Sequence, residues 1–372
     1  MVSMVSRICS AKRLLVGGFA LSVAFMLAVR GAQAQPVAAS PYTLTTFPGV
    51  PPNQGTPPSP ATKPDDLAIS ADGADLWVAY QNNAAPDGTS GTSNIVEYEI
   101  STGKVLQNVI IAGHTDGLKI NPKTNEVWTT QNEDASPTLA EINPKNGKFK
   151  TFGFVNPTAH GGGFDDFVFA GKNSQDVFIS ASNPAGPPFT SQAIVQISGK
   201  PAKVTKVTQT LAGNATAFNV VTGADETLAI SDADSMTLDP AGELVLDSQG
   251  DDELIVVRSA TATNPVLNVP LTMSGVPTEV NDTIFVGSTS GMISTAGTLF
   301  ITDTGGNAIY TLTKPYFPPS EVYTVADAVG DIGLLDMNTG IITPVVTGLV
   351  HPNGIAFSPA AVALVTLPIP KK

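Results

Sequence analysis

A strand–hairpin–strand pattern recurs six times along the chain and constrains its fold more than any other feature. Each copy has two short stretches of alternating apolar and polar residues, joined by a turn rich in Asp, Asn, Gly and Pro. Such alternation is typical of half-buried strands in a hairpin. "DGLKINPKTNEVWTTQNED", which begins at Asp116, shows the pattern most fully. The other copies begin at Asp65, Asp165, Asp234, Ser290 and Asn353.

Most copies continue with two weaker strands, so that one repeat holds about four antiparallel strands in some 40 to 50 residues. This is the sequence signature of a β-propeller blade. We predict an all-β propeller of six blades, with seven blades as the alternative because residues 307–348 supply more strands than expected. The alternating segment 42–47 is predicted to close the ring by adding an N-terminal strand to the last blade. A β-helix or a pair of sandwiches is the rival fold.

Composition supports short strands rather than helices. The chain has 34 Gly and 30 Pro among 372 residues, and only 14% of its residues are charged. Long tracts of strong helix formers are absent from the sequence, and the abundant turn residues fit many short strands.

The first 34 residues resemble an export signal. Arg7, Lys12 and Arg13 precede an apolar stretch over residues 14–29, and Ala32-Gln33-Ala34 offers a small-residue cleavage site; a retained membrane anchor is the alternative. We therefore expect an exported protein, periplasmic or extracellular, with no stable membrane insertion after cleavage. Residues 35–63 form a lead-in rich in Pro and Thr, and residues 64–372 form a single propeller domain. The one cysteine, Cys9, lies in the signal, so the mature chain has no disulfide.

The acidic balance of the chain excludes some partners. Four of the 19 basic residues lie before residue 35, so residues 35–372 carry 15 basic and 32 acidic side chains, a balance of −17. Such a chain repels nucleic acid and anionic lipid. The expected partner is a small molecule, a glycan or another protein, and the oligomeric state stays open.

A column of carboxylates and amides stands at the start of the predicted inner strands. Because the first strand of each blade lines the central channel, these residues are expected to surround one channel mouth. Carboxylate and amide oxygens suit Ca²⁺ or Mg²⁺; capping of the adjacent backbone is the structural alternative. The candidate metal ligands are Asp65, Asp116, Asp165, Asp234 and Asn353.

The three histidines all precede inner strands. His114 and His351 lie two residues before Asp116 and Asn353, and His160 lies five residues before Asp165. Imidazoles on one face could act as general acids or bases, and they would favour Zn²⁺ if they bind a metal. They are therefore the candidate catalytic residues, with turn capping or surface exposure as the alternative.

The segments that leave the second strands supply further polar groups to the same face. Their amides and carboxylates could bind the hydroxyl groups of a ligand. The candidate ligand-binding residues are Gln81, Asn132, Glu133, Asn183, Gln249 and Asp303.

Several stretches resemble the NHL and SMP-30/gluconolactonase-like propellers, which are six-bladed. "HPNGIAFSP", "TDGLKINP" and "GTLFITDTGGNAIYTL" carry this resemblance, which covers about residues 64 to 360. It implies a propeller that is a lactonase, a lyase or a non-catalytic binder, and some propeller lyases use a His-ligated metal at this mouth. The glutamate that SMP-30-like enzymes place before the first inner strand is replaced here by Asp65 and Asp66, which argues against lactonase chemistry.

Three functions remain open from the sequence. The first is a binding propeller for a small polar ligand, glycan or protein partner, together with a divalent metal. The second is a metal-dependent hydrolase or lyase at the same site, and the third is a structural envelope protein. Dinucleotide, Walker and H-E-x-x-H patterns are absent from the sequence, so no organic cofactor is expected.

Overall fold

In the computed structural model, the regular structure of the described residues is β-strand, apart from two short 3₁₀ turns, η1 (Gln249–Asp251) and η2 (Asp327–Val329). The prediction of an all-β fold is confirmed for the described part of the chain. The predicted signal over residues 1–34 lies outside it. The structure describes residues 35–48, 61–155, 162–171, 176–182, 184, 186–198, 205–286, 296–319 and 321–360.

The first two sheets are built from consecutive strands. One has four strands in the order β3-β4-β5-β6, and the other has eight in the order β11-β12-β13-β14-β10-β9-β8-β7. The four-stranded sheet contains β3 (Pro64–Ile69), β4 (Asp75–Tyr80), β5 (Thr92–Glu99) and β6 (Val105–Ala112). The eight-stranded sheet contains β7 (Thr115–Ile120), β8 (Val127–Gln131), β9 (Thr138–Ile142), β10 (Phe149–Val155), β11 (Phe167–Ala170), β12 (Asp176–Ser180), β13 (Gln192–Ser198) and β14 (Thr205–Ala212).

The third sheet carries an additional hairpin at its outer edge. Its six strands run in the order β16-β15-β20-β19-β18-β17, and β15 pairs in parallel with β20. The strands are β15 (Thr216–Asn219), β16 (Ala224–Thr227), β17 (Ala233–Leu238), β18 (Leu244–Ser248), β19 (Glu253–Val257) and β20 (Val266–Pro270).

The last two sheets interleave along the chain. After β23 the chain forms two strands of the neighbouring sheet, and it then returns to pair with β23. The seven-stranded sheet contains β1 (Val37–Ala38), β21 (Thr272–Met273), β22 (Val276–Pro277), β23 (Thr283–Phe285), β26 (Val322–Ala326), β27 (Asp331–Asp336) and β28 (Ile341–Thr347). The final sheet contains β2 (Thr43–Thr46), β25 (Ala308–Thr313), β24 (Gly297–Asp303) and β29 (Pro352–Pro359), in that order.

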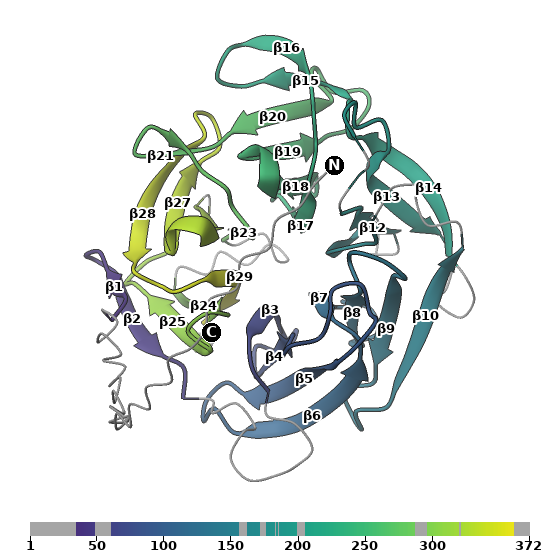
Figure 1. Cartoon of the computed structure of the whole chain (residues 1–372). Helices are drawn as coiled ribbons and strands as arrows, with labels where there is room; N and C mark the ends of the chain where they lie inside the picture. Colours follow the sequence, from purple (N-terminus) through teal and green to yellow (C-terminus); the bar gives the residue numbers. More distant parts are fainter. Residues whose placement is uncertain are drawn as a thin grey trace, which may run out of the picture. The chain divides into compact units, whose positions relative to one another are not determined.

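The sheets of the described residues surround a central axis as in a β-propeller (Figure 1). Their inner strands contact one another in turn: β3 with β7, then β11, β17, β23 and β29, which contacts β3 again. The N-terminal strand β2 is the outer strand of the sheet whose inner strand is β29.

The prediction of six separate blades is wrong, because the described strands form five sheets. The difference arises where β10 and β14 pair in parallel, which joins two four-stranded meanders in one eight-stranded sheet. The interleaving of β23 to β26 accounts for the surplus of strands over residues 307–348. Ser290, the predicted start of the fifth repeat, lies outside the described residues. The second strand of that repeat, β24, pairs with β29, and the inner strand that sequence reasoning did not recognise is β23, in the neighbouring sheet.

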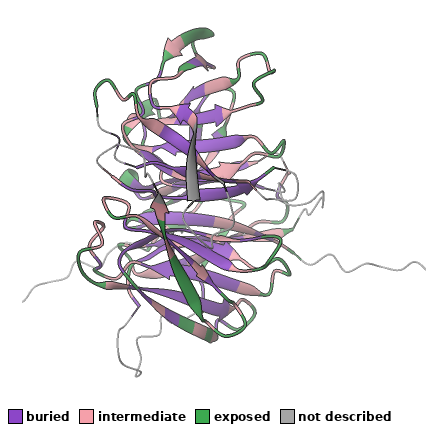
Figure 2. Ribbon diagram, turned by 90° about the vertical axis from the view of Figure 1, so that its right-hand side faces the viewer, coloured by how far each residue is buried: buried purple, intermediate pink, exposed green. Residues whose placement is uncertain are grey.

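Apolar packing between neighbouring sheets forms the core. Trp77 lies in a cluster with Leu118 and Ile142, which joins the first sheet to the second. Phe300 lies in a cluster with Leu67 and Tyr98, which joins the last sheet to the first. Buried positions accordingly concentrate inside the sheets, and exposed ones at turns and outer strands (Figure 2). Burial on both faces leaves the loops at the channel ends free to carry polar groups. No helix among the described residues is long and apolar enough to cross a membrane.

Candidate functional site

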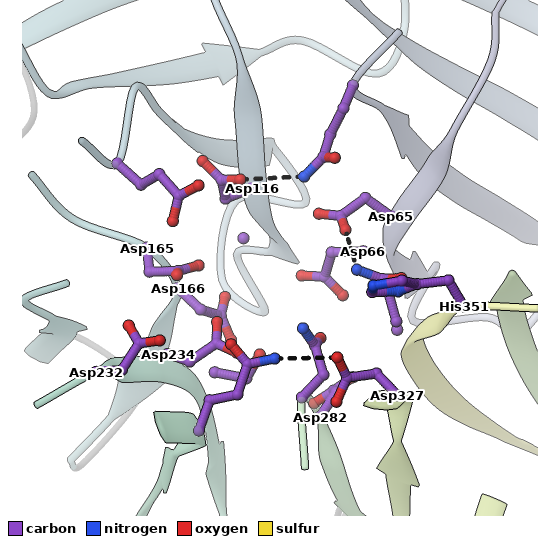
Figure 3. A pocket seen from close by; sticks show the side chains of 18 residues that line it. Asp65, Asp66, Asp116, Asp165, Asp166, Asp232, Asp234, Asp282, Asp327 and His351 are labelled. Carbon is purple, nitrogen blue, oxygen red and sulfur yellow. Dashed lines mark hydrogen bonds between the residues drawn. The ribbon is translucent and has the colours of Figure 1, made fainter. Parts of the chain in front are cut away.

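A polar cavity of about 410 Å³ lies where the inner strands begin. Two consecutive residues in or just before each of the six inner strands line the cavity, and together they form two rings. The first ring consists of Asp65, Asp116, Asp165, Asp234, Asn281 and Asn353, and the second ring of Asp66, Gly117, Asp166, Ser235, Asp282 and Gly354. Figure 3 shows the aspartates of both rings around the cavity.

β-Bulges explain why two successive residues face the same cavity. The pairing register shifts at these two residues where β3 meets β4, where β7 meets β8, where β17 meets β18 and where β24 meets β29. A regular strand would turn one of the two side chains to the opposite face, and a bulge re-aims it. The first residues of these consecutive pairs therefore form the first ring, and the second residues form the second ring.

The aspartates of the second ring join neighbouring inner strands. Asp66 lies in β3, and Asp166 and Asp282 immediately precede β11 and β23, so the three belong to alternate inner strands. Each accepts a hydrogen bond at Oδ2 from a backbone N–H of the next inner strand. The donors are Leu118 to Asp66 at 2.6 Å, Met236 to Asp166 at 2.9 Å and Ile355 to Asp282 at 2.8 Å.

Lys119 supplies a cation to the second ring. Its ammonium lies 2.9 Å from Asp66 Oδ2 and 2.8 Å from Asp166 Oδ2. Burial lowers the pKa of Lys119, but Asp166, Asp66 and Asp282 outweigh it and hold that pKa well above its usual range. Burial raises the pKa of Asp166 to about 6 and that of Asp282 to about 8, although the ammonium opposes both shifts. The second ring is thus partly neutralised by the chain itself.

Among the described residues, no Lys or Arg forms an ion pair with the first ring; the basic contact of its carboxylates is His114, which lies beside Asp116. Burial, and then the charge of Asp116, hold the pKa of Asp65 well above its usual range. Burial likewise raises the pKa values of Asp165 and Asp234 well above theirs. The buried Oδ2 atoms of Asp116 and Asp234 have no hydrogen-bond partner among the described residues. Bound cations or hydrogen-bond donors would therefore stabilise this ring.

His114 and Glu133 extend the first ring at Asp116. His114 Nε2 lies 3.1 Å from Asp116 Oδ1 and 4.0 Å from Glu133 Oε1. Burial lowers the pKa of His114, but the hydrogen bond and charge of Asp116 raise it to about 9. The charge of Asp116, followed by burial, raises the pKa of Glu133 to about 8. Such a cluster can exchange protons or bind a metal.

The structure separates the residues predicted to bind ligand into two groups. Gln81, Glu133 and Gln249 line the cavity. Asn132 instead accepts the N–H of His114, and Asp303 accepts the N–H groups of Gly306, Val350 and His351; neither lines the cavity. Asn183 lies outside the described residues.

The predicted histidines are also divided. His114 is buried beside Asp116, whereas His351 lines the cavity and contacts Asn353 with Nδ1 at 3.1 Å. His160 lies outside the described residues. In Figure 3, Asp65 lies between His351 and Asp116, so the two described histidines belong to different parts of the mouth.

Among the cavity residues with carboxyl or amide side chains, sequence reasoning missed six, and it also missed Lys119. Four of the six belong to the adjacent polar pairs Asp65-Asp66, Asp165-Asp166 and Asn281-Asp282. The recurrence of such pairs before or within inner strands is the signal that could have revealed them. The missed lining residues are Asp66, Asp166, Asp232, Asn281, Asp282 and Asp327.

The fold and site define an all-β propeller with an acidic channel mouth. No protein-family model matches the chain, and no curated protein matches it.

Several solved structures are similar to the chain in fold. Virginiamycin B lyase from Staphylococcus aureus is 13% identical, with a TM-score of 0.45 over 82% of this chain and 87% of that chain. A putative 6-phosphogluconolactonase from Bacteroides uniformis is 14% identical, with a TM-score of 0.45 over 81% and 90%. Kuenenia stuttgartiensis hydrazine synthase is 12% identical, with a TM-score of 0.44 over 77% and 80%. Similarity this low says nothing about the site, which must be judged from its own residues.

Proposed function

We propose that the protein is an exported binding propeller that holds a small, hydroxyl-rich or amino-bearing molecule in the cavity at its channel mouth. The observation that carries this proposal is the first ring of carboxyl groups, which is buried and has no Lys or Arg beside it in the lining. Carboxylates accept hydrogen bonds, so their natural complement is a ligand with many O–H or N–H donors.

The size and polarity of the cavity narrow the ligand class. A volume of about 410 Å³ lies within the usual range for small-molecule sites. Ten carboxyl side chains line it, together with Gln81, Gln249, Asn281 and Asn353. An anionic ligand would add charge to this set and is disfavoured. A sugar-sized polyol or amino sugar satisfies the acceptors best.

Titration calorimetry with three sugars of similar shape tests the proposal. We expect glucosamine to bind most tightly, glucose more weakly and glucuronate least, because their charges run from positive to negative. A matched control is Asp336→Asn, which removes an exposed carboxylate that does not line the cavity. Equal binding of glucuronate and glucosamine, or no saturable binding of any of the three, would overturn the proposal.

A second candidate function is a hydrolase or lyase of the NHL or SMP-30/gluconolactonase-like class. The contact of 3.1 Å between His114 Nε2 and Asp116 Oδ1 beside the cavity favours it, since such a pair can transfer protons. Turnover of gluconolactone that is lost in His114→Ala would support this function. Sugar binding without turnover would support the binding propeller instead.

A further inference from the structure

We propose that His114, Asp116 and Glu133 form a binding site for a divalent transition metal, with Zn²⁺ or Mn²⁺ preferred over Ca²⁺. This inference deepens the proposed binding function and rests on it for the role of the adjoining cavity. One ligand atom from each of the three side chains lies within 4.8 Å of the other two. Ligands of one Zn²⁺ ion at bond lengths near 2.1 Å stand about 3.4 Å apart. The observed separations of 3.1 and 4.0 Å lie on either side of this value.

An unpartnered oxygen provides independent support for a missing ligand. Asp116 is 5% exposed and lines the cavity. Its Oδ1 receives Gln81 Nε2 at 3.2 Å, but its buried Oδ2 has no hydrogen-bond partner among the described residues. A buried carboxylate oxygen without a donor is costly unless a cation satisfies it. A metal held between Asp116, His114 and Glu133 would do so.

The imidazole is oriented as a metal ligand requires. His114 Nδ1 lies 3.0 Å from the carbonyl oxygen of Ala84, so Nδ1 carries the proton in that bond. When a metal displaces the Nε2 proton that Asp116 otherwise accepts, the ring presents the lone pair of Nε2 between the two carboxylates. Metal-binding histidines commonly fix their second nitrogen on a backbone carbonyl in this way. The loop after β4 thereby orients two ligands, since it holds His114 through Ala84 and Asp116 through Gln81.

The backbone around Glu133 is also held in place. Asn132 adopts a φ of +63° and accepts the N–H of His114 at 3.1 Å. A Cβ at Gly113 would lie 2.4 Å from Asn132 Oδ1, so glycine is required for this approach. The Glu133 side chain stays 27% exposed and lines the cavity. It can therefore complete a site whose remaining positions open to ligand or water.

The donor set selects the class of metal. Imidazole nitrogen favours zinc and other first-row transition metals, whereas Ca²⁺ prefers six to eight oxygen ligands. One imidazole and two carboxylates suit Zn²⁺ and Mn²⁺. The second ring offers no equivalent site, because Lys119 already occupies the space between Asp66 and Asp166.

Calorimetric titration of chelator-treated protein with ZnCl₂, MnCl₂ and CaCl₂ tests the site. We expect one Zn²⁺ per chain, and at least ~10-fold weaker binding in His114→Ala, Asp116→Asn and Glu133→Gln. His351→Ala, which removes the other described histidine, is the matched control and should bind Zn²⁺ as the wild type does. Glu133 is partly exposed, so its variant remains a test even if a substitution at buried Asp116 prevents folding.

Three results would overturn the metal site. They are no binding of Zn²⁺ or Mn²⁺ by the wild type, equal binding by His114→Ala and Glu133→Gln, and Ca²⁺ binding that does not depend on His114. Glucosamine binding measured in the presence of chelator separates this inference from the proposed function. Sugar binding without Zn²⁺ binding removes only the metal, and Zn²⁺ binding without sugar binding removes only the sugar ligand.

Discussion

The two rings at the channel mouth contain similar carboxylates but differ in how their charge is balanced. In the second ring, Asp66, Asp166 and Asp282 bind backbone N–H groups of neighbouring strands, and Lys119 lies among them. In the first ring, Asp65, Asp165 and Asp234 form no ion pair with a Lys or Arg of the described residues, and Asp116 contacts only the imidazole of His114 among basic side chains. The comparison shows that two successive positions of one repeat can have different roles. The carboxylates of the second ring stabilise the fold, and those of the first ring remain available to a ligand.

The pH dependence of stability should show the largest effect of the uncompensated charge. Burial raises the folded-state pKa values of Asp65, Asp165 and Asp234 well above their usual values. The folded chain therefore binds more protons than the unfolded chain above pH about 4, and stability falls as pH rises. We expect the free energy of unfolding, measured by urea denaturation without metal, to drop by several kcal/mol between about pH 5 and pH 8.

Asp234→Asn sharpens that prediction. The variant should show a flatter pH profile than the wild type, because it removes one of the groups that must ionise in the buried ring. Asp336→Asn, at the exposed end of β27, should leave the profile unchanged over this pH range. A wild-type protein that becomes more stable from pH 5 to pH 8 would contradict this account of the first ring.

Removing the cation of the second ring should have the next largest effect. Lys119→Met leaves Asp66 and Asp166 buried without a counter-charge, and loss of one partner from a buried ion pair costs about 3 kcal/mol. Urea denaturation near neutral pH measures the loss, with Lys123→Met on an exposed turn as the control. A cost equal to that of the control would show that Lys119 does not stabilise the ring.

The smallest of the three expected effects on the free energy of unfolding is the difference between two matched substitutions, one in each ring. Asp166→Asn loses the ion pair with Lys119 and weakens the bond from Met236, so about 1–3 kcal/mol of stability should be lost. Asp234→Asn, in the adjacent inner strand, should leave stability unchanged or raise it at pH 8, because it relieves repulsion within the first ring. Denaturation of both variants at about pH 8 makes the comparison. Equal losses would mean that the two rings do not differ as described.

The candidate site was predicted only in part from the sequence, for identifiable reasons. Asp116 was found because a carboxylate stood at the start of a well-formed repeat, and Glu133 because it followed the second strand of that repeat. Asp282 was missed because β23 has only three residues, too few to show alternation. Lys119 was missed because a charged residue in an alternating strand normally faces solvent. Here it faces a channel whose existence depends on all the inner strands.

The sequence by itself determined the strands, the turns between them and the carboxylates that begin the inner strands, because alternation and turn residues are local signals. The tertiary structure alone decided that β24 pairs with β25 and β29 rather than with β23, and that β10 and β14 share one sheet. It also decided which carboxylates share Lys119 and which stand beside His114. These choices depend on contacts between residues far apart in the chain. Such contacts are set by how the sheets pack around the axis and not by any neighbouring residues.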